Sequence, residues 1–131
     1  MSLKRGLIGS LLASLVVLAA RRWLDVVEVR GRSMSPTLLP GDRLLIARRA
    51  PRVGDVVVAA DPRDPHRELI KRVARMDPSG VDLRGDNADA STDARGFGSV
   101  PVGVVRWRAV ARYWPAARIG RLPAAPVAEG G

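Results

Sequence analysis

Residues 53–75 read VGDVVVAADPRDPHRELIKRVAR, and this stretch decides the fold class. It holds two short apolar runs, Asp55–Ala60 and Glu68–Arg75, which contain the β-branched residues that strands favour. The two Asp-Pro pairs at 61–62 and 64–65 interrupt regular structure between the runs. The stretch therefore predicts two β-strands joined by a turn.

Similar runs flank this pair on both sides. They cover Leu24–Arg30, Arg43–Ala47, Val81–Arg84 and Val104–Ala111, with turn-forming Gly, Pro, Asp and Asn residues between them. Strands at this spacing indicate a mainly β fold, with a compact antiparallel domain over residues 24–115. The Ala-, Pro- and Gly-rich remainder, residues 116–131, is expected to be a flexible tail.

The first part of the chain carries an uncharged, mostly apolar run of 15 residues, Gly6–Ala20, with basic residues on both sides. As a helix it spans about 22 Å, which is short of the roughly 30 Å hydrocarbon core of a bilayer. We interpret residues 1–23 as a short membrane anchor, lengthened by flanking arginines and by Trp23 at the interface. An uncleaved signal-like or peripheral helix and a buried helix of a soluble domain are the alternatives.

The composition argues against several kinds of chemistry. The chain of 131 residues has no cysteine and one histidine, His66, which disfavours disulfides, thiolate catalysis and a zinc site. We therefore expect neither a metal nor a cofactor, and we expect His66 to be a solvated loop residue. The formal net charge of +9 favours an anionic neighbour such as lipid headgroups or nucleic acid.

Lys71 is one of only two lysines among 22 basic residues, and it lies in the strand-like run Glu68–Arg75. Arginine does not lose its proton in a protein, whereas a lysine in an apolar setting can. Lys71 is therefore a candidate general base. The alternative is an edge-strand lysine whose ammonium group reaches solvent.

Residues 31–42, GRSMSPTLLPGD, offer a nucleophile for such a base. Gly31 allows a sharp turn, and a serine hydroxyl beside its own exposed backbone N–H can attack a carbonyl and stabilise the oxyanion. Spacing does not distinguish Ser33 from Ser35. A serine-rich turn that forms hydrogen bonds with itself is the structural alternative.

A third segment, residues 84–98, is a polar loop that reads RGDNADASTDARGFG. It is long enough to fold over a site. In it, Ser91 can accept a hydrogen bond from a lysine, and Asp93 and Arg95 can pair to hold the shape of the loop. A plain surface loop is the alternative.

Together, these segments resemble the type I signal peptidases, the serine/lysine-dyad proteases of the S26 family. That family has a Ser-Met-x-Pro-Thr-Leu box with the nucleophile, a Lys-Arg-Val box with the base, and a Gly-Asp-Asn…Ser-x-Asp-Ser-Arg…Gly box that closes the site. Here the boxes are residues 33–38, 71–73 and 85–98, in the same order. The resemblance implies coiled antiparallel sheets and an N-terminal anchor.

The resemblance also implies a role for each matching residue. Ser33 is the expected nucleophile, Lys71 the general base and Ser91 the hydroxyl that orients the lysine. Gly31 belongs to the oxyanion site, which relies mainly on the Ser33 backbone N–H. The other matches are assigned to the substrate pocket or to structural support: Met34, Pro36, Gly85, Asp86, Asn87, Asp93 and Arg95.

The chain departs from the family pattern in three respects. Gly31 stands where some members have a serine that helps to hold the oxyanion. Ala94 stands where the third box usually has serine, and the short span between Lys71 and Gly85 lacks the large extra β-domain of some bacterial members. This minimal form is similar to the mitochondrial inner-membrane peptidases and to the short proteases proposed to mature nickel-type superoxide dismutase.

The expected function is removal of signal peptides or leader segments from preproteins with small residues before the cut. A maturation protease with a single client is one alternative, and a non-catalytic basic β-module that binds membrane or nucleic acid is another. We expect a membrane-associated protein whose catalytic domain lies outside the cytoplasm. Six arginines in residues 95–121, interleaved with aromatic residues, favour membrane lipid over nucleic acid as a partner.

Overall fold

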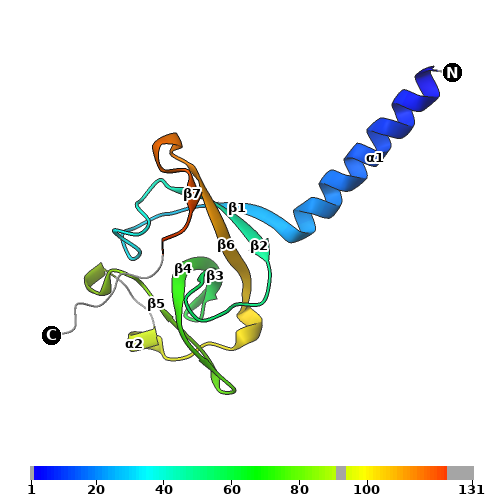
Figure 1. Cartoon of the computed structure of the whole chain (residues 1–131). Coiled ribbons are helices and arrows are strands. Elements are labelled where there is room, and N and C mark those ends of the chain that lie inside the picture. The colour runs from blue at the N-terminus through cyan, green and yellow to red at the C-terminus, as the bar shows by residue number, and fades with distance from the viewer. Residues whose placement is uncertain (1, 91–93, 124–131) are drawn as a thin grey trace.

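A long helix, α1 (Ser2–Trp23), passes without a linker into the first strand of a β-domain (Figure 1). The computed structural model describes residues 2–90 and 94–123. Seven strands lie in this part of the chain: β1 (Leu24–Glu28), β2 (Arg43–Arg48), β3 (Val56–Asp61), β4 (Asp64–Asp77), β5 (Gly80–Arg84), β6 (Val105–Trp114) and β7 (Gly120–Arg121). Short helical turns join them: η1 (Ala88–Ala90), α2 (Ala94–Phe97), η2 (Val102–Val104) and η3 (Ala116–Arg118).

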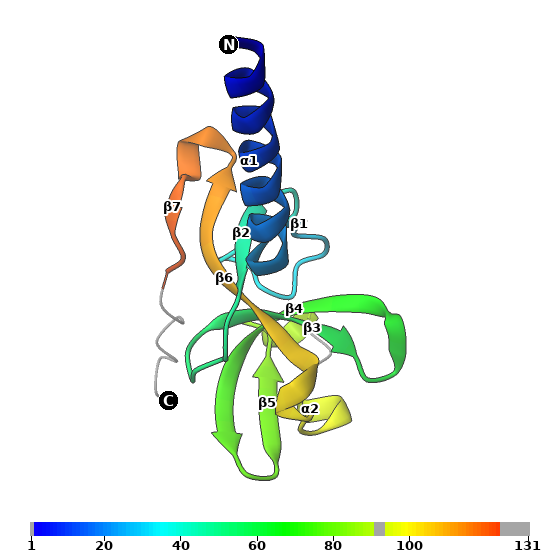
Figure 2. The ribbon, with the colours of Figure 1, turned by 90° about the vertical axis from the view of Figure 1, so that its right-hand side faces the viewer.

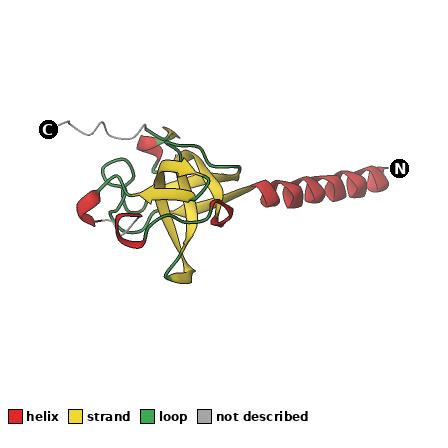
Figure 3. Ribbon diagram, turned by 90° about the horizontal axis from the view of Figure 1, so that it is seen from below, coloured by secondary structure: helices red, strands yellow, loops and turns green. Residues whose placement is uncertain are grey.

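The strands form one antiparallel sheet in the order β1-β2-β6-β3-β4-β5, with β7 beside β6. Figure 3 shows that the sheet coils on itself, with α1 projecting away from it. The predicted mainly β fold with an N-terminal apolar helix is therefore confirmed.

Strand β3 explains why one apolar run decides the fold. Successive residues of a strand point to opposite faces, and Val56–Ala59 are all buried. Val56 and Val58 pack in one core cluster with Met34, whereas Val57 and Ala59 pack in a second cluster. Residues 56–59 thus supply both layers of the core, and this part of β3 is buried on both faces.

Strand β4 begins earlier than the sequence predicts. Asp61 closes a tight hairpin, because its Oδ1 accepts the backbone N–H of Arg63 (2.9 Å) and its Cα pairs with that of Asp64. The strand therefore starts at Asp64, and His66 lies in a strand rather than in a loop. His66 is exposed, as expected.

Helix α1 is longer than the apolar run that predicts it. Its 22 residues span about 33 Å, so Leu3–Trp23 is long and apolar enough to cross a membrane. Its leucines are exposed, from Leu15 at 52% to Leu3 at 79%. The alternative of a buried helix is therefore wrong. Figure 2 shows α1 at one end of the molecule and the β4–β5 hairpin at the other.

The segment expected to be a flexible tail has structure in its described part. Residues up to Pro123 contain η3 and β7, and β7 pairs with β6 at Ala111 and Arg112. Leu122 packs against the core cluster around Met34. This tertiary packing holds a short strand that the local composition does not predict.

Candidate active site

Residues 29–42 connect β1 to β2 in a series of turns, with Gly31 and Gly41 at positive φ. Gly31 has φ +75°, so the sharp turn predicted there is present. The N–H of Leu38 donates to the carbonyl of Met34 (2.9 Å), and both side chains are buried in the core. Ser33 is half-buried just before this anchored turn.

Lys71 lies in the middle of β4, where it pairs with Val57 of β3. Only 3% of its surface is exposed. The alternative of an edge lysine that reaches solvent is therefore wrong. Removing an ammonium group from water disfavours its charged form, which is the condition that a lysine base needs.

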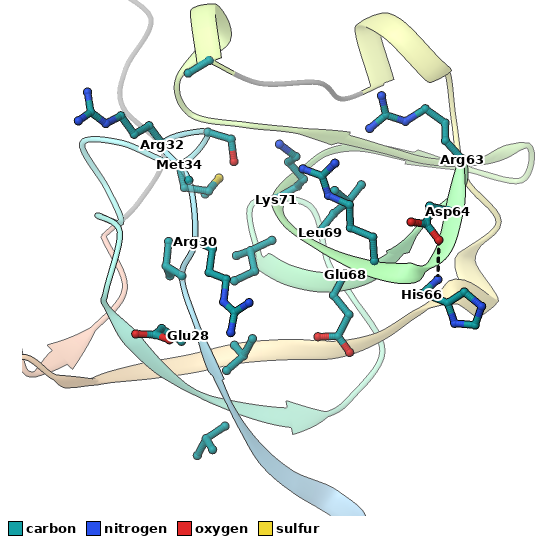
Figure 4. A pocket seen from close by; sticks show the side chains of 18 residues that line it. Glu28, Arg30, Arg32, Met34, Arg63, Asp64, His66, Glu68, Leu69 and Lys71 are labelled. Atoms are coloured by element: carbon teal, nitrogen blue, oxygen red, sulfur yellow. Dashed lines mark hydrogen bonds between the residues drawn. The ribbon is translucent and has the colours of Figure 1, made fainter.

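A cavity of about 840 Å³ brings Ser33 and Lys71 to one site. Residues 26–34 line it from one segment and residues 63–64 and 66–71 from another, and Ala90 also lines it. Figure 4 shows Met34 and Lys71 on these two segments, with Glu28 and Glu68 farther along the cavity. Gly31 also lines it, whereas Ser35 and the exposed Pro36 are not among the lining residues.

A buried ion pair lies beside this cavity and joins the three sequence boxes. Arg72 donates to both carboxylate oxygens of Asp86, from Nε to Oδ1 (2.9 Å) and from Nη2 to Oδ2 (2.8 Å). The hydroxyl of Thr37 donates to the same Oδ2 (2.5 Å). The sequence predicts a supporting role for Asp86, but it does not identify Arg72 and Thr37 as its partners.

Asn87 fixes the backbone around Ser33. Its N–H donates to the carbonyl of Ser33 (2.9 Å), and its Nδ2 donates to the carbonyl of Arg32 (3.1 Å). Asp86 and Asn87 thus hold the turn segment at two points, while the preceding Gly85 is buried.

Other residues of the third box are only partly described. Ser91 and Asp93 lie outside the described residues, so their expected roles stay predictions. Arg95 belongs to α2, and its side chain also lies outside what the structure describes. Phe97 of this helix contacts the Arg63 guanidinium, 5.5 Å from the ring centre, which ties α2 to the β3–β4 hairpin.

A second buried carboxylate belongs to Asp42, in the turn just before β2. It accepts the N–H of Leu39 (2.9 Å), and it also binds two arginines. Arg112 Nη1 lies 3.0 Å from Oδ2, and Arg118 donates to Oδ1. Two of the six arginines predicted for a lipid-facing surface therefore hold a buried acid instead. Both arginines lie far from Asp42 in the sequence, so the sequence alone does not predict this contact.

Asp61, at the hairpin beside the cavity, has an altered acidity. Hydrogen bonds from the Arg63 side chain (3.0 and 2.9 Å), and then from the Arg63 backbone N–H, lower the pKa of this carboxyl below its ordinary value. Burial acts in the opposite direction and is outweighed. Arg63, the partner of this carboxylate, also lines the cavity.

The described residues of the site offer a hydroxyl, an amine and backbone N–H groups. No cluster of three or more His, Asp or Glu side chains that could hold a metal ion occurs in residues 2–90 and 94–123. This set of groups suits nucleophilic attack by a hydroxyl with a lysine as base.

Comparison with known proteins agrees with this chemistry. The model of the signal peptidase, peptidase S26, family matches residues 4–84. Mitochondrial ATP-independent inner membrane protease subunit 1a of Arabidopsis thaliana is 35% identical over 127 residues, which cover 76% of each chain. Mitochondrial inner membrane protease subunit 1 of Homo sapiens is 33% identical, over 77% of this chain and 76% of that protein. Subunit 2 of Danio rerio is 31% identical, over 77% and 70%.

Proposed function

This chain belongs to the peptidase S26 family of signal peptidases, and we propose that Ser33 and Lys71 form the dyad with which it cuts leader segments from preproteins. Membership makes it a serine hydrolase of the signal-peptidase type. The observation that supports the dyad is that these two residues, from different elements, line the same cavity. The near-complete burial of Lys71 supports its role as the base.

The reaction begins when the neutral Nζ of Lys71 takes the proton of the Ser33 hydroxyl. Oγ attacks the scissile carbonyl, and the C–N bond breaks as the lysine returns the proton to the leaving amine. The acyl-enzyme that remains is an ester of Ser33. Lys71 then takes a proton from water, and the hydroxide attacks the ester carbonyl. The C–O bond to Ser33 Oγ breaks, the carboxyl product leaves, and Lys71 returns its proton to Oγ. A free lysine has a pKa of about 10.4, so this cycle at neutral pH depends on the burial of Lys71.

The oxyanion of each tetrahedral intermediate needs a donor. We assign this role to the backbone N–H of Ser33, with Gly31 providing the turn that presents it. The carbonyl groups of Arg32 and Ser33 accept hydrogen bonds from Asn87, which supports a fixed orientation of these peptide units.

The substrate is an extended peptide that adds to open strand edges along the cavity. Among the described strands, β1 pairs only with β2, and β4 pairs with β5 only from Arg72 onward. Residues 26–28 and 64–70 therefore lie at strand edges that no other described strand pairs with, and all of them except Pro65 line the cavity. Main-chain hydrogen bonds to such edges bind peptides without regard to side chains. We assign Met34, which lines the cavity, to a shallow pocket that admits small residues before the cut.

Helix α1 supports a location in the membrane, and we propose that it anchors a catalytic domain outside the cytoplasm. Trp23, Leu24 and Val26 are 42–63% exposed at the junction of helix and strand, where lipid headgroups would surround them. Arg43 stacks on the exposed Trp114 ring (5.6 Å) on the same strand pair, β2 and β6. These residues support contact with lipid as well as with the preprotein.

The side of the membrane is tested by a single cysteine. Because the chain has none, Pro78→Cys in the exposed β4–β5 turn is a unique label site. We expect an impermeant maleimide to modify it in intact cells. Labelling only after lysis contradicts the extracytoplasmic location.

The dyad is tested by cleavage of a preprotein in detergent, with three variants. Ser33→Ala is expected to abolish cleavage, whereas Ser35→Ala retains it. Lys71→Arg keeps a positive charge but cannot act as a base at neutral pH, so cleavage is also lost. Near-normal cleavage by Lys71→Arg contradicts the assignment of the base. If Ser35→Ala loses activity while Ser33→Ala retains it, the nucleophile is Ser35 and not Ser33.

A further inference from the structure

Thr37 is held between two buried ion pairs, one through its hydroxyl and the other through its carbonyl. We propose that the Thr37 hydroxyl is a positioning group that sets the placement of Ser33 relative to Lys71. This inference rests on the proposed dyad, and it assigns to Thr37 a role that goes beyond packing.

The first contact leads from Thr37 to the strand that carries Lys71. Thr37 is 7% exposed, and its Oγ1 donates to Asp86 Oδ2 at 2.5 Å. The same oxygen receives Arg72 Nη2 at 2.8 Å. Since Arg72 directly follows Lys71 in β4, only Asp86 stands between the Thr37 hydroxyl and the side chain next to the base.

The second contact holds Thr37 from the other side. Its carbonyl accepts a hydrogen bond from Arg112 Nη1 (3.0 Å), and this nitrogen also lies 3.0 Å from Asp42 Oδ2. Asp42 is fully buried. Thr37 therefore has little freedom to shift unless a buried charge loses its partner, which is costly.

The position of Thr37 is transmitted to Ser33 through short backbone links. The N–H of Leu38 donates to the carbonyl of Met34, the residue after Ser33. On the opposite side, the N–H of Asn87, the residue after Asp86, donates to the carbonyl of Ser33. Asn87 thus binds the segment just before Met34, at Ser33. Asp86 binds it after Met34, through the Thr37 hydroxyl.

This arrangement matters because catalysis by a hydroxyl and an amine depends on their separation. A misplacement of about 1 Å can reduce a rate by about 100-fold. Hydrogen bonds to a carboxylate are short and strong, so they define geometry better than packing alone does. Losing the hydroxyl frees the Ser33 segment to move while the cavity that binds the substrate persists.

Thr37→Val tests the inference because valine has nearly the same shape but no hydroxyl. We expect kcat for preprotein cleavage to fall at least tenfold while KM stays within twofold. Thr37→Ser, which restores the donor, is expected to recover kcat to within threefold of the original. The matched control is Ser35→Ala, which removes a hydroxyl from the same segment whose only described contact is with the carbonyl of Leu38 (3.4 Å).

A purely structural role for Thr37 predicts a different pattern. In that case Thr37→Val lowers Tm while the folded enzyme keeps its kcat, and this result overturns the proposal. Equal losses of kcat in Thr37→Val and Thr37→Ser also overturn it. If Thr37→Val does not fold, Thr37→Ala is measured against Thr37→Ser in the same way. Failure of the dyad is recognised separately, because Ser33→Ala then remains active.

Discussion

Arg72 and Asp86 form a two-bonded ion pair whose side chains are only 8% and 5% exposed. The pair joins β4, at the residue next to Lys71, to the turn that follows β5. Asp86 also accepts a hydrogen bond from Thr37, in the segment that carries Ser33. The two proposed catalytic residues are therefore connected by a buried charge pair that lies outside the cavity itself.

Asp86→Ala is expected to destabilise the protein by about 3–5 kcal/mol, because it leaves the buried Arg72 guanidinium without its carboxylate. Urea unfolding in detergent measures the loss. The control is Arg75→Gln, since the Arg75–Asp77 pair is exposed (71% and 31%) and solvent screens it, so its loss is expected to change stability little. Equal losses in the two variants would mean that burial does not set the strength of these pairs.

Gly31→Ala is expected to destabilise the protein by about 1 kcal/mol, because φ +75° is strained for any residue with a Cβ. No atom lies within 4 Å of the added Cβ, so the cost comes from the backbone alone. Gly103→Ala is the control, since its Cβ also meets open space and its φ lies outside the left-handed region. A thermal melt that ranks Gly103→Ala below Gly31→Ala contradicts this reasoning.

Asp61→Asn is expected to reduce the acid dependence of stability. The Arg63 hydrogen bonds lower the pKa of Asp61 in the folded state, so its contribution is complete above the unfolded pKa of about 3.9. The contribution is lost as the pH falls through the lower, folded pKa. Urea midpoints of original and variant should therefore differ at pH 7 and converge below pH 4. Arg63→Gln removes the hydrogen bonds that cause the pKa shift, so it should show the same pH dependence. A difference in urea midpoint that grows as the pH falls would contradict the prediction.

Leu12→Arg tests the membrane helix. Leu12 is 56% exposed near the middle of α1, where an arginine costs about 2.5–3.5 kcal/mol in membrane insertion. We expect the variant to shift toward the alkaline-soluble fraction of cell membranes. Lys4→Gln, near the start of the helix, should stay in the pellet, and equal extraction of both variants would argue against a spanning helix.

The sequence predicts the fold well where local pattern and burial agree. The run Val56–Ala59 forms a strand because it is buried on both faces. The pattern fails at Asp64–Arg67, since this first part of β4 is exposed and shows no alternation of apolar and polar residues. It also fails at Gly120–Arg121, where two residues form a strand only because β6 lies beside them.

The candidate site divides in the same way. The motifs predict Ser33 and Lys71 as the catalytic pair, and both residues line the same cavity. The partners of Asp86 and Asp42 could not be predicted, because the chain has 20 arginines and spacing does not say which of them meets a buried acid. The tertiary fold decides which arginine pairs with which buried acid, and the sequence shows only that arginines are present.

The direct passage from Trp23 of the helix to Leu24 of the first strand has a consequence for how targets are found. Because no flexible linker separates helix and strand, the β-domain stays close to the lipid surface in which the helix would lie. The enzyme then meets its substrates mainly by lateral diffusion at the membrane surface. Preproteins bound to the same membrane therefore reach the cavity far more often than freely dissolved ones do.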